Sequence, residues 1–120
     1  MNDMLSWLLA GHVVGDYLFQ NRWMATKKTM LLSALVSHSA VYACAIWISS
    51  LPDGGLSPFS VLFVFATHVV IDKRDFTRWW CRHVTQSDGT LWLVMMADQS
   101  FHIVILALTC FMERAYKGGF

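Results

Sequence analysis

Four apolar segments, separated by polar connections, occupy most of this 120-residue chain. They cover about residues 4–20, 30–51, 58–72 and 91–112. A helix needs about 20 residues to cross the hydrocarbon core of a bilayer, and the second and fourth segments reach that length easily. We therefore predict an all-α polytopic membrane protein, a bundle of four transmembrane helices that forms a single domain over residues 1–120.

The composition supports a membrane location and excludes other classes of protein. The chain is 56% hydrophobic and 14% charged, whereas soluble domains carry about 25% charged residues. A net charge of +1 excludes a nucleic acid as a partner on electrostatic grounds, since basic and acidic residues nearly cancel. The three cysteines form no C-x-x-C pair, which argues against a disulfide framework or a thiolate zinc site.

The basic residues predict how the bundle is oriented. Seven of the nine lie in two connections, residues 21–29 and residues 73–90. By the positive-inside rule both connections face the cytoplasm, and both termini lie on the other side of the membrane. We expect the first connection to be a short polar link. The second carries Trp79 and Trp80 and predicts an amphipathic segment at the membrane interface.

Ionisable residues inside the apolar segments are the strongest functional signal. Three segments carry a histidine and an aspartate four residues apart, a spacing that places both side chains on one helix face. These pairs are His12/Asp16, His68/Asp72 and Asp98/His102, and the remaining segment carries His38. Antiparallel packing of the four helices would bring all seven residues into the cytoplasmic half of the membrane.

Charged groups at that depth need compensation. One aspartate at the centre of a bilayer costs about 2.5–3.5 kcal/mol, so we expect these residues to pair, to line water or to bind an ion. Imidazole and carboxylate are the usual ligands of Zn²⁺, Mn²⁺ and Fe²⁺. The pattern predicts one or two divalent ions, with Zn²⁺ preferred and Mn²⁺ or Fe²⁺ as alternatives. The candidate metal ligands are His12, Asp16, His38, His68, Asp72, Asp98 and His102. A proton relay and a purely structural polar core are the competing interpretations.

Several neighbouring residues are candidates for supporting roles. Gln20 and Gln99 flank the pairs and are expected to hydrogen-bond the metal ligands. The basic connections are predicted to bind an anionic headgroup, unless they serve only to set the topology. The candidates for headgroup binding are Lys27, Lys28, Arg74, Arg78 and Arg82. Gly11 and Gly15 predict a close approach between two helices.

These motifs carry a family resemblance. The runs His12-Val-Val-Gly-Asp16-Tyr-Leu-Phe-Gln20, His68-Val-Val-Ile-Asp72 and Asp98-Gln99-Ser-Phe-His102, together with His38, resemble a small bacterial and phage membrane family, domain of unknown function 3307. The resemblance extends from Leu8 to His102 and implies a membrane protein of bacterial or phage origin. We therefore expect a multi-pass protein of the bacterial inner membrane, whose termini are periplasmic by the positive-inside rule. It implies no activity. The His/Asp pattern is also distantly similar to that of the YdjM-type membrane-bound metal-dependent hydrolases.

Three functions are compatible with these residues. The first is a metal-dependent hydrolase acting on a lipid or other amphiphile that arrives from the cytoplasmic leaflet. The metal would lower the pKa of a bound water, and one of Asp16, Asp72 and Asp98 would act as general base. The second is transport of a divalent cation or of protons, for which we expect a homo-oligomer. The third is a non-catalytic protein that interacts with another phage or host membrane protein.

Overall fold

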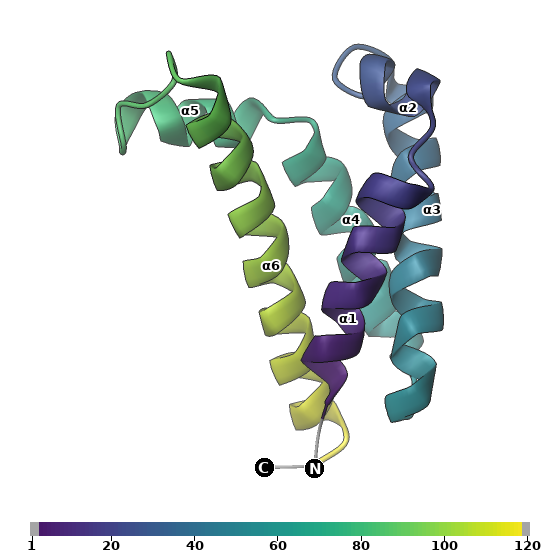
Figure 1. Ribbon diagram of the computed structural model, residues 1–120. Helices are drawn as coiled ribbons and strands as arrows, with labels where there is room; N and C mark the ends of the chain where they lie inside the picture. Colours follow the sequence, from purple (N-terminus) through teal and green to yellow (C-terminus); the bar gives the residue numbers. More distant parts are fainter. Residues whose placement is uncertain (1–2, 119–120) are drawn as a thin grey trace.

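The computed structural model describes residues 3–118, and this part of the chain is built from helices with no strand (Figure 1). The elements are α1 (Met4–Val13), a π-helical turn (Val14–Leu18), α2 (Arg22–Lys27), α3 (Leu32–Ser50), a 3-10 turn (Leu51–Asp53), α4 (Pro58–Asp72), α5 (Asp75–His83) and α6 (Leu91–Tyr116). The predicted all-α class is confirmed. The ends of the predicted domain, residues 1–2 and 119–120, lie outside the described residues.

The four apolar segments of the sequence correspond to α1 with its π-helical turn, to α3, to α4 and to α6. Two helical stretches are long and apolar enough to cross a membrane, the 22 residues Leu32–Asp53 and the 26 residues Leu91–Tyr116. The apolar helix Pro58–Asp72 is shorter, with 15 residues. By length and composition the structure thus contains two candidate spans, and the predicted set of four stays a prediction.

The first connection differs from its prediction as a simple polar link, because residues Arg22–Lys27 form the short helix α2. The side chain of Asn21 caps this helix by accepting the backbone N–H of Met24 at 2.9 Å. Such a cap satisfies an N–H group that the first helical turn leaves free. The sequence does not predict this short helix, because its six residues show no apolar periodicity.

The second connection contains the amphipathic helix α5, and its predicted position at the membrane interface stays a prediction. Thr77 and Cys81 are buried on one side of this helix. Phe76 and Trp79 are 42% and 52% exposed on another side. At the start of the helix, Arg74 has a left-handed backbone, with φ of 73°. This turn ends α4 and lets α5 leave at a different angle from the bundle (Figure 1).

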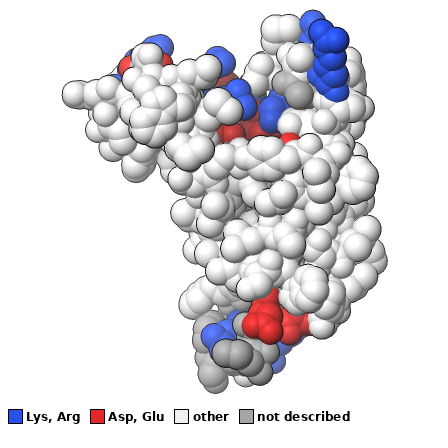
Figure 2. All heavy atoms as spheres, viewed as in Figure 1, with Lys and Arg blue, Asp and Glu red and all other residues white. Residues whose placement is uncertain are grey.

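The bundle closes through neighbouring helix pairs. Helix α1 packs on α3, α3 packs on α4, α4 packs on α6, and α6 also contacts α1. Helices α2 and α5 lie at one end of the molecule, and the beginning of α1 and the end of α6 lie at the other (Figure 1). The two basic connections therefore share one end. Charged side chains lie at both ends of the visible face, and its middle is uncharged (Figure 2).

The contact between α1 and α3 depends on glycine. A Cβ atom on Gly11 would lie 2.8 Å from Oγ of Ser49, and one on Gly15 would lie 2.9 Å from Cδ2 of Tyr42. Both distances are too short for a real side-chain contact, so the two helices approach as closely as they do only because these side chains are absent. The close approach predicted from Gly11 and Gly15 is confirmed.

The core divides into an apolar half and a polar half, and the apolar half also encloses a small buried polar group in which Glu113 accepts hydrogen bonds from Ser57 and Ser60. Leu8, Ile46, Val64 and Leu106 are buried together towards the end that carries the beginning of α1 and the end of α6. The polar half lies towards α2 and α5 and contains the histidines and aspartates of the candidate site. The apolar half therefore lies between the candidate site and the end of the molecule that carries the beginning of α1 and the end of α6.

Candidate metal centre

Asp16 lies in the π-helical turn that follows α1. This turn is π-helical because the backbone N–H of Phe19 donates to the carbonyl of Val14, five residues earlier, at 2.9 Å. Such turns occur frequently at functional sites. Oδ1 of Asp16 lies 3.0 Å from Nε2 of His38 and 3.4 Å from Nε2 of His68. One carboxylate thereby connects α1 with both α3 and α4.

Asp72 supplies a second carboxylate from the last turn of α4. Its Oδ2 lies 3.3 Å from Nε2 of His38, and its Oδ1 lies 3.7 Å from Nε2 of His102. The side chains of both aspartates and of these histidines are at most 4% exposed. Three imidazoles and two carboxylates from four different elements therefore meet inside the bundle.

The meeting point contains two overlapping groups of candidate metal ligands. Asp16, His38 and His68 form one group, and His68, Asp72 and His102 form the other. Within each group the ligand atoms all lie within 4.8 Å of one another, and His68 belongs to both. These buried groups can hold a metal ion. Imidazole and carboxylate donors suit Zn²⁺, Mn²⁺ and Fe²⁺ alike.

The orientation of His102 is fixed by its own helix. Its Nδ1 lies 2.7 Å from the backbone carbonyl oxygen of Asp98, which only accepts hydrogen bonds, so Nδ1–H is the donor. In the neutral imidazole the other nitrogen, Nε2, then carries a lone pair. This buried Nε2 has no hydrogen-bond partner among residues 3–118, and it faces the two carboxylates. A backbone carbonyl that orients a histidine in this way is common at metal sites.

Two further residues, Ser39 and Tyr42, contact the imidazole of His68. The hydroxyl of Ser39 lies 2.9 Å from Nδ1 of His68. The ring of Tyr42 stacks on His68 with 3.9 Å between the ring centroids. Sequence reasoning missed both residues. Tyr42 follows His38 by one helical turn on α3, and this spacing was the available signal.

His12 lies beside the two ligand groups and belongs to neither of them. Its Nε2 is 2.7 Å from the amide oxygen of Gln99, so Nε2–H donates there, and its Nδ1 accepts from the hydroxyl of Tyr42 at 2.8 Å. Nδ1 is also 3.8 Å from Oδ2 of Asp16. Both ring nitrogens are engaged, so the structure places His12 in the surrounding hydrogen-bond network.

Asp98 also lies outside the two ligand groups. Its Oδ2 is 3.4 Å from Nε2 of Gln99 and 3.9 Å from Nε of Arg74. Its Oδ1 is buried and has no hydrogen-bond partner among the described residues. Gln99 therefore contacts His12 and Asp98. Gln20 instead donates from its side-chain amide to the backbone carbonyl of Asp16 at 2.8 Å.

The basic residues predicted to bind a headgroup divide into two sets. Lys28 is buried, and its Nζ lies 3.0 Å from Oδ1 and 2.9 Å from Oδ2 of Asp72. The structure thus corrects the expectation for Lys28, because the uncompensated charge of Asp72 draws its ammonium group inside. Lys27 is exposed, and three arginines line a pocket beside α5. The surface is hollowed between α5 and α2, and acidic and basic side chains are visible at the bottom of this hollow (Figure 2).

Comparison with known proteins places this architecture in one family. No curated protein and no solved structure matches the chain. A family model described as a protein of unknown function (DUF3307) matches residues 4–117, which contain every helix of the bundle and every residue of the candidate centre. The chain belongs to the DUF3307 family.

Proposed function

We propose that this protein is a metal-dependent membrane hydrolase that acts on a lipid or other amphiphile. The observation that carries the proposal is the convergence of the Nε2 atoms of His38, His68 and His102 on the carboxylates of Asp16 and Asp72. Two buried carboxylates repel each other, and a divalent cation is the natural group to neutralise them.

The orientation of His102 supports a cation in particular. With Nδ1–H donated to the carbonyl of Asp98, its Nε2 lone pair points at the carboxylates of Asp16 and Asp72, 4.0 Å and 3.7 Å away. Lone pairs that face one another in a buried place are unfavourable. Lys28 donates to Asp72, but Nε2 of His102 has no hydrogen-bond partner among residues 3–118. A metal ion accepts electron pairs from all three groups at once.

The chemistry follows from how the aspartates are placed. A divalent ion at this centre would lower the pKa of a bound water. Asp16 and Asp72 each contact imidazoles and serve as metal ligands in the proposal. Asp98 lies one helical turn from His102, outside both ligand groups, with one carboxylate oxygen unpartnered in the described structure. That free oxygen suits the general base, which takes the proton from the attacking water.

The proposal includes a bundle of four membrane spans. Helices α3 and α6 have the length to cross a bilayer. The 15 residues of α4 extend only about 22 Å, and α1 with its π-helical turn is equally short. Both end towards α2 and α5 (Figure 1), at the end of the molecule where the surface is hollowed (Figure 2). The basic end with α2 and α5 is assigned to the cytoplasm and the opposite end to the periplasm of a bacterial inner membrane.

The apolar half of the core favours hydrolysis over transport. Leu8, Ile46 and Leu106 are completely buried beneath the centre and fill the interior of the bundle there. A transported ion has to leave on the side opposite to its entry, and these side chains stand in that path. The burial of the centre likewise speaks against a mere docking role, for which residues of this kind would lie on the surface.

Elemental analysis of the purified full-length protein in an uncharged detergent tests the proposal. We expect a stoichiometric first-row metal in the wild type and a much lower content in His68→Ala, which removes the ligand common to both groups. His83→Ala is the matched control, because His83 is exposed on α5. Hydrolysis of lipid substrates should follow the metal content. A well-folded wild type that takes up no Zn²⁺, Mn²⁺ or Fe²⁺ would overturn the proposal.

A further inference from the structure

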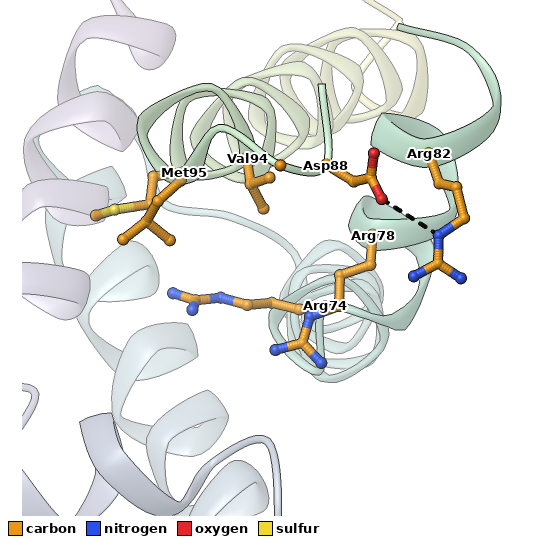
Figure 3. Close-up of a pocket in the computed structure, with 8 residues that line it drawn as sticks. Arg74, Arg78, Arg82, Asp88, Val94 and Met95 are labelled. Atoms are coloured by element: carbon orange, nitrogen blue, oxygen red, sulfur yellow. Dashed lines mark hydrogen bonds and ion pairs between the residues drawn. The ribbon is translucent and has the colours of Figure 1, made fainter. Parts of the chain in front are cut away.

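A pocket of about 440 Å³ lies between α5 and the beginning of α6. One wall carries the guanidinium groups of three arginines, and the other is largely apolar (Figure 3). The residues that matter are Arg74, Arg78 and Arg82 on the first wall and Leu91, Val94 and Met95 on the second. A pocket with one cationic and one apolar wall matches a ligand that is itself amphiphilic.

The spacing of the arginines explains why they share one wall. Arg78 and Arg82 are four residues apart, which places them along one face of α5. Arg74 immediately precedes this helix, and its carbonyl accepts the backbone N–H of Arg78 at 2.9 Å. Thr77 and Cys81 are buried on another face of the helix and fix its rotation against the bundle. The guanidinium groups are therefore held towards the pocket as a group.

The arginines are only partly neutralised by this chain. Nε of Arg82 lies 3.4 Å from Oδ2 of Asp88, and Nε of Arg74 lies 3.9 Å from Oδ2 of Asp98. The guanidinium of Arg78 has no ion-pair or hydrogen-bond partner among residues 3–118. In the view of Figure 3 it lies between the guanidinium groups of the other two arginines. The middle of the cationic wall thus retains an unused charge.

The number of donors indicates which anion fits. Each guanidinium presents a rigid fork of N–H groups that pairs with two oxygens of one anion. A single carboxylate has two oxygens and is saturated by one such fork. A phosphate offers three or four oxygens and accepts forks from several directions. We propose that this pocket binds the phosphate group of an amphiphile, whose hydrocarbon part lies along Leu91, Val94 and Met95.

The pocket is joined to the candidate metal centre through Arg74. This residue lines the pocket and also lies 3.9 Å from Asp98, the proposed general base on α6. A phosphate held by the arginines therefore brings the adjoining part of the same molecule towards the centre. The substrate class that follows is a phosphate-bearing amphiphile. This last step rests on the proposed hydrolase function, whereas the binding of the phosphate does not.

Calorimetric titration of the full-length protein in an uncharged detergent tests the inference. The probes are dihexanoyl phosphatidate, dihexanoylglycerol without phosphate, and inorganic phosphate. We expect phosphatidate to bind, dihexanoylglycerol not to bind, and inorganic phosphate to bind about tenfold more weakly, since it lacks the apolar contacts. Arg78→Gln should weaken the binding of phosphatidate about tenfold, through loss of a charge-assisted fork. Arg22→Gln, on exposed α2, is the matched control and should bind as the wild type does.

Three results would overturn the inference. The first is equal affinity for dihexanoylglycerol and phosphatidate. The second is wild-type affinity for phosphatidate in Arg78→Gln. The third is inorganic phosphate that binds as tightly as phosphatidate, which would indicate a site for a free anion. Repeating the titration after removal of metal by a chelator separates the two proposals. If a protein that never holds metal still binds phosphatidate, the proposed phosphate pocket is supported and the proposed hydrolase function is overturned. Stoichiometric metal with binding unaffected by Arg78→Gln would do the reverse.

Discussion

Nζ of Lys28 lies 3.0 Å from Oδ1 of Asp72, and both side chains are buried although 44 residues separate them in the chain. The contact fixes the end of α2 against the last turn of α4. It also gives the candidate centre an ammonium group of its own beside the carboxylates of Asp16 and Asp72. In the absence of a metal ion, Lys28 is therefore the main compensating charge for Asp72.

Replacing Lys28 by methionine should destabilise the protein most strongly when it is free of metal. Removal of one partner from a buried ion pair costs about 3–5 kcal/mol, because the other charge is left uncompensated. A divalent ion bound to Asp72 would supply part of the missing charge. We expect a clearly lower Tm for metal-free Lys28→Met in detergent and a partial recovery on addition of Zn²⁺.

Lys27→Met is the matched control for that experiment, because Lys27 is the neighbouring lysine and is exposed. Its Tm should equal that of the wild type with and without metal. If metal-free Lys28→Met unfolded at the same temperature as Lys27→Met, the ion pair with Asp72 would have no energetic role.

Substitution of His12 and substitution of His102 should have different effects on metal affinity. His102 directs Nε2 at the carboxylates, whereas both nitrogens of His12 are engaged by Tyr42 and Gln99. We expect His102→Ala, which removes a candidate ligand, to lower Zn²⁺ affinity much more than His12→Ala, which removes only a member of the surrounding hydrogen-bond network. Competition with a chromophoric chelator measures both affinities. Greater loss in His12→Ala than in His102→Ala would contradict this description of the centre.

The sequence predicts the helices well because their signals are local. Apolar runs identify the four long elements, and a spacing of four residues places histidine and aspartate on one face of a helix. Which faces meet is a property of the packed bundle. The separation of His12 from the ligand groups, for example, depends on Tyr42 and Gln99, which come from two other helices.

Two kinds of residue escaped prediction for different reasons. Lys28 resembles Lys27 in every local respect, and only the position of Asp72 draws one of them inside. The π-helical turn around Asp16 changes the rotation of the helix within one turn, and nothing in the composition of Val14–Leu18 marks it. Tyr42 was detectable in principle, because it shares a buried face of α3 with His38.

Replacing Tyr42 by phenylalanine should separate the role of its hydroxyl from that of its ring. The hydroxyl lies 2.8 Å from Nδ1 of His12, and the ring stacks on His68. Loss of the hydroxyl leaves a buried nitrogen unpaired, which costs about 1–3 kcal/mol. We expect a lower Tm with metal content retained, measured beside Tyr116→Phe, a control at a residue that is 73% exposed. Loss of metal from Tyr42→Phe would show that the hydroxyl acts on the ligands themselves.

A single methyl group on Gly15 should disturb the centre from outside it. The new Cβ would lie 2.9 Å from Cδ2 of Tyr42, whose ring stacks on His68, so the ring has to move or α1 has to withdraw from α3. Overpacking of this kind costs about 1–3 kcal/mol. We expect Gly15→Ala to lower both the Tm and the affinity for Zn²⁺. Gly89→Ala is the matched control, because no atom lies within 4 Å of its added Cβ, and its stability should stay within about 0.5 kcal/mol of the wild type. Equal behaviour of the two variants would mean that contact between α1 and α3 does not position Tyr42 or the ligands behind it.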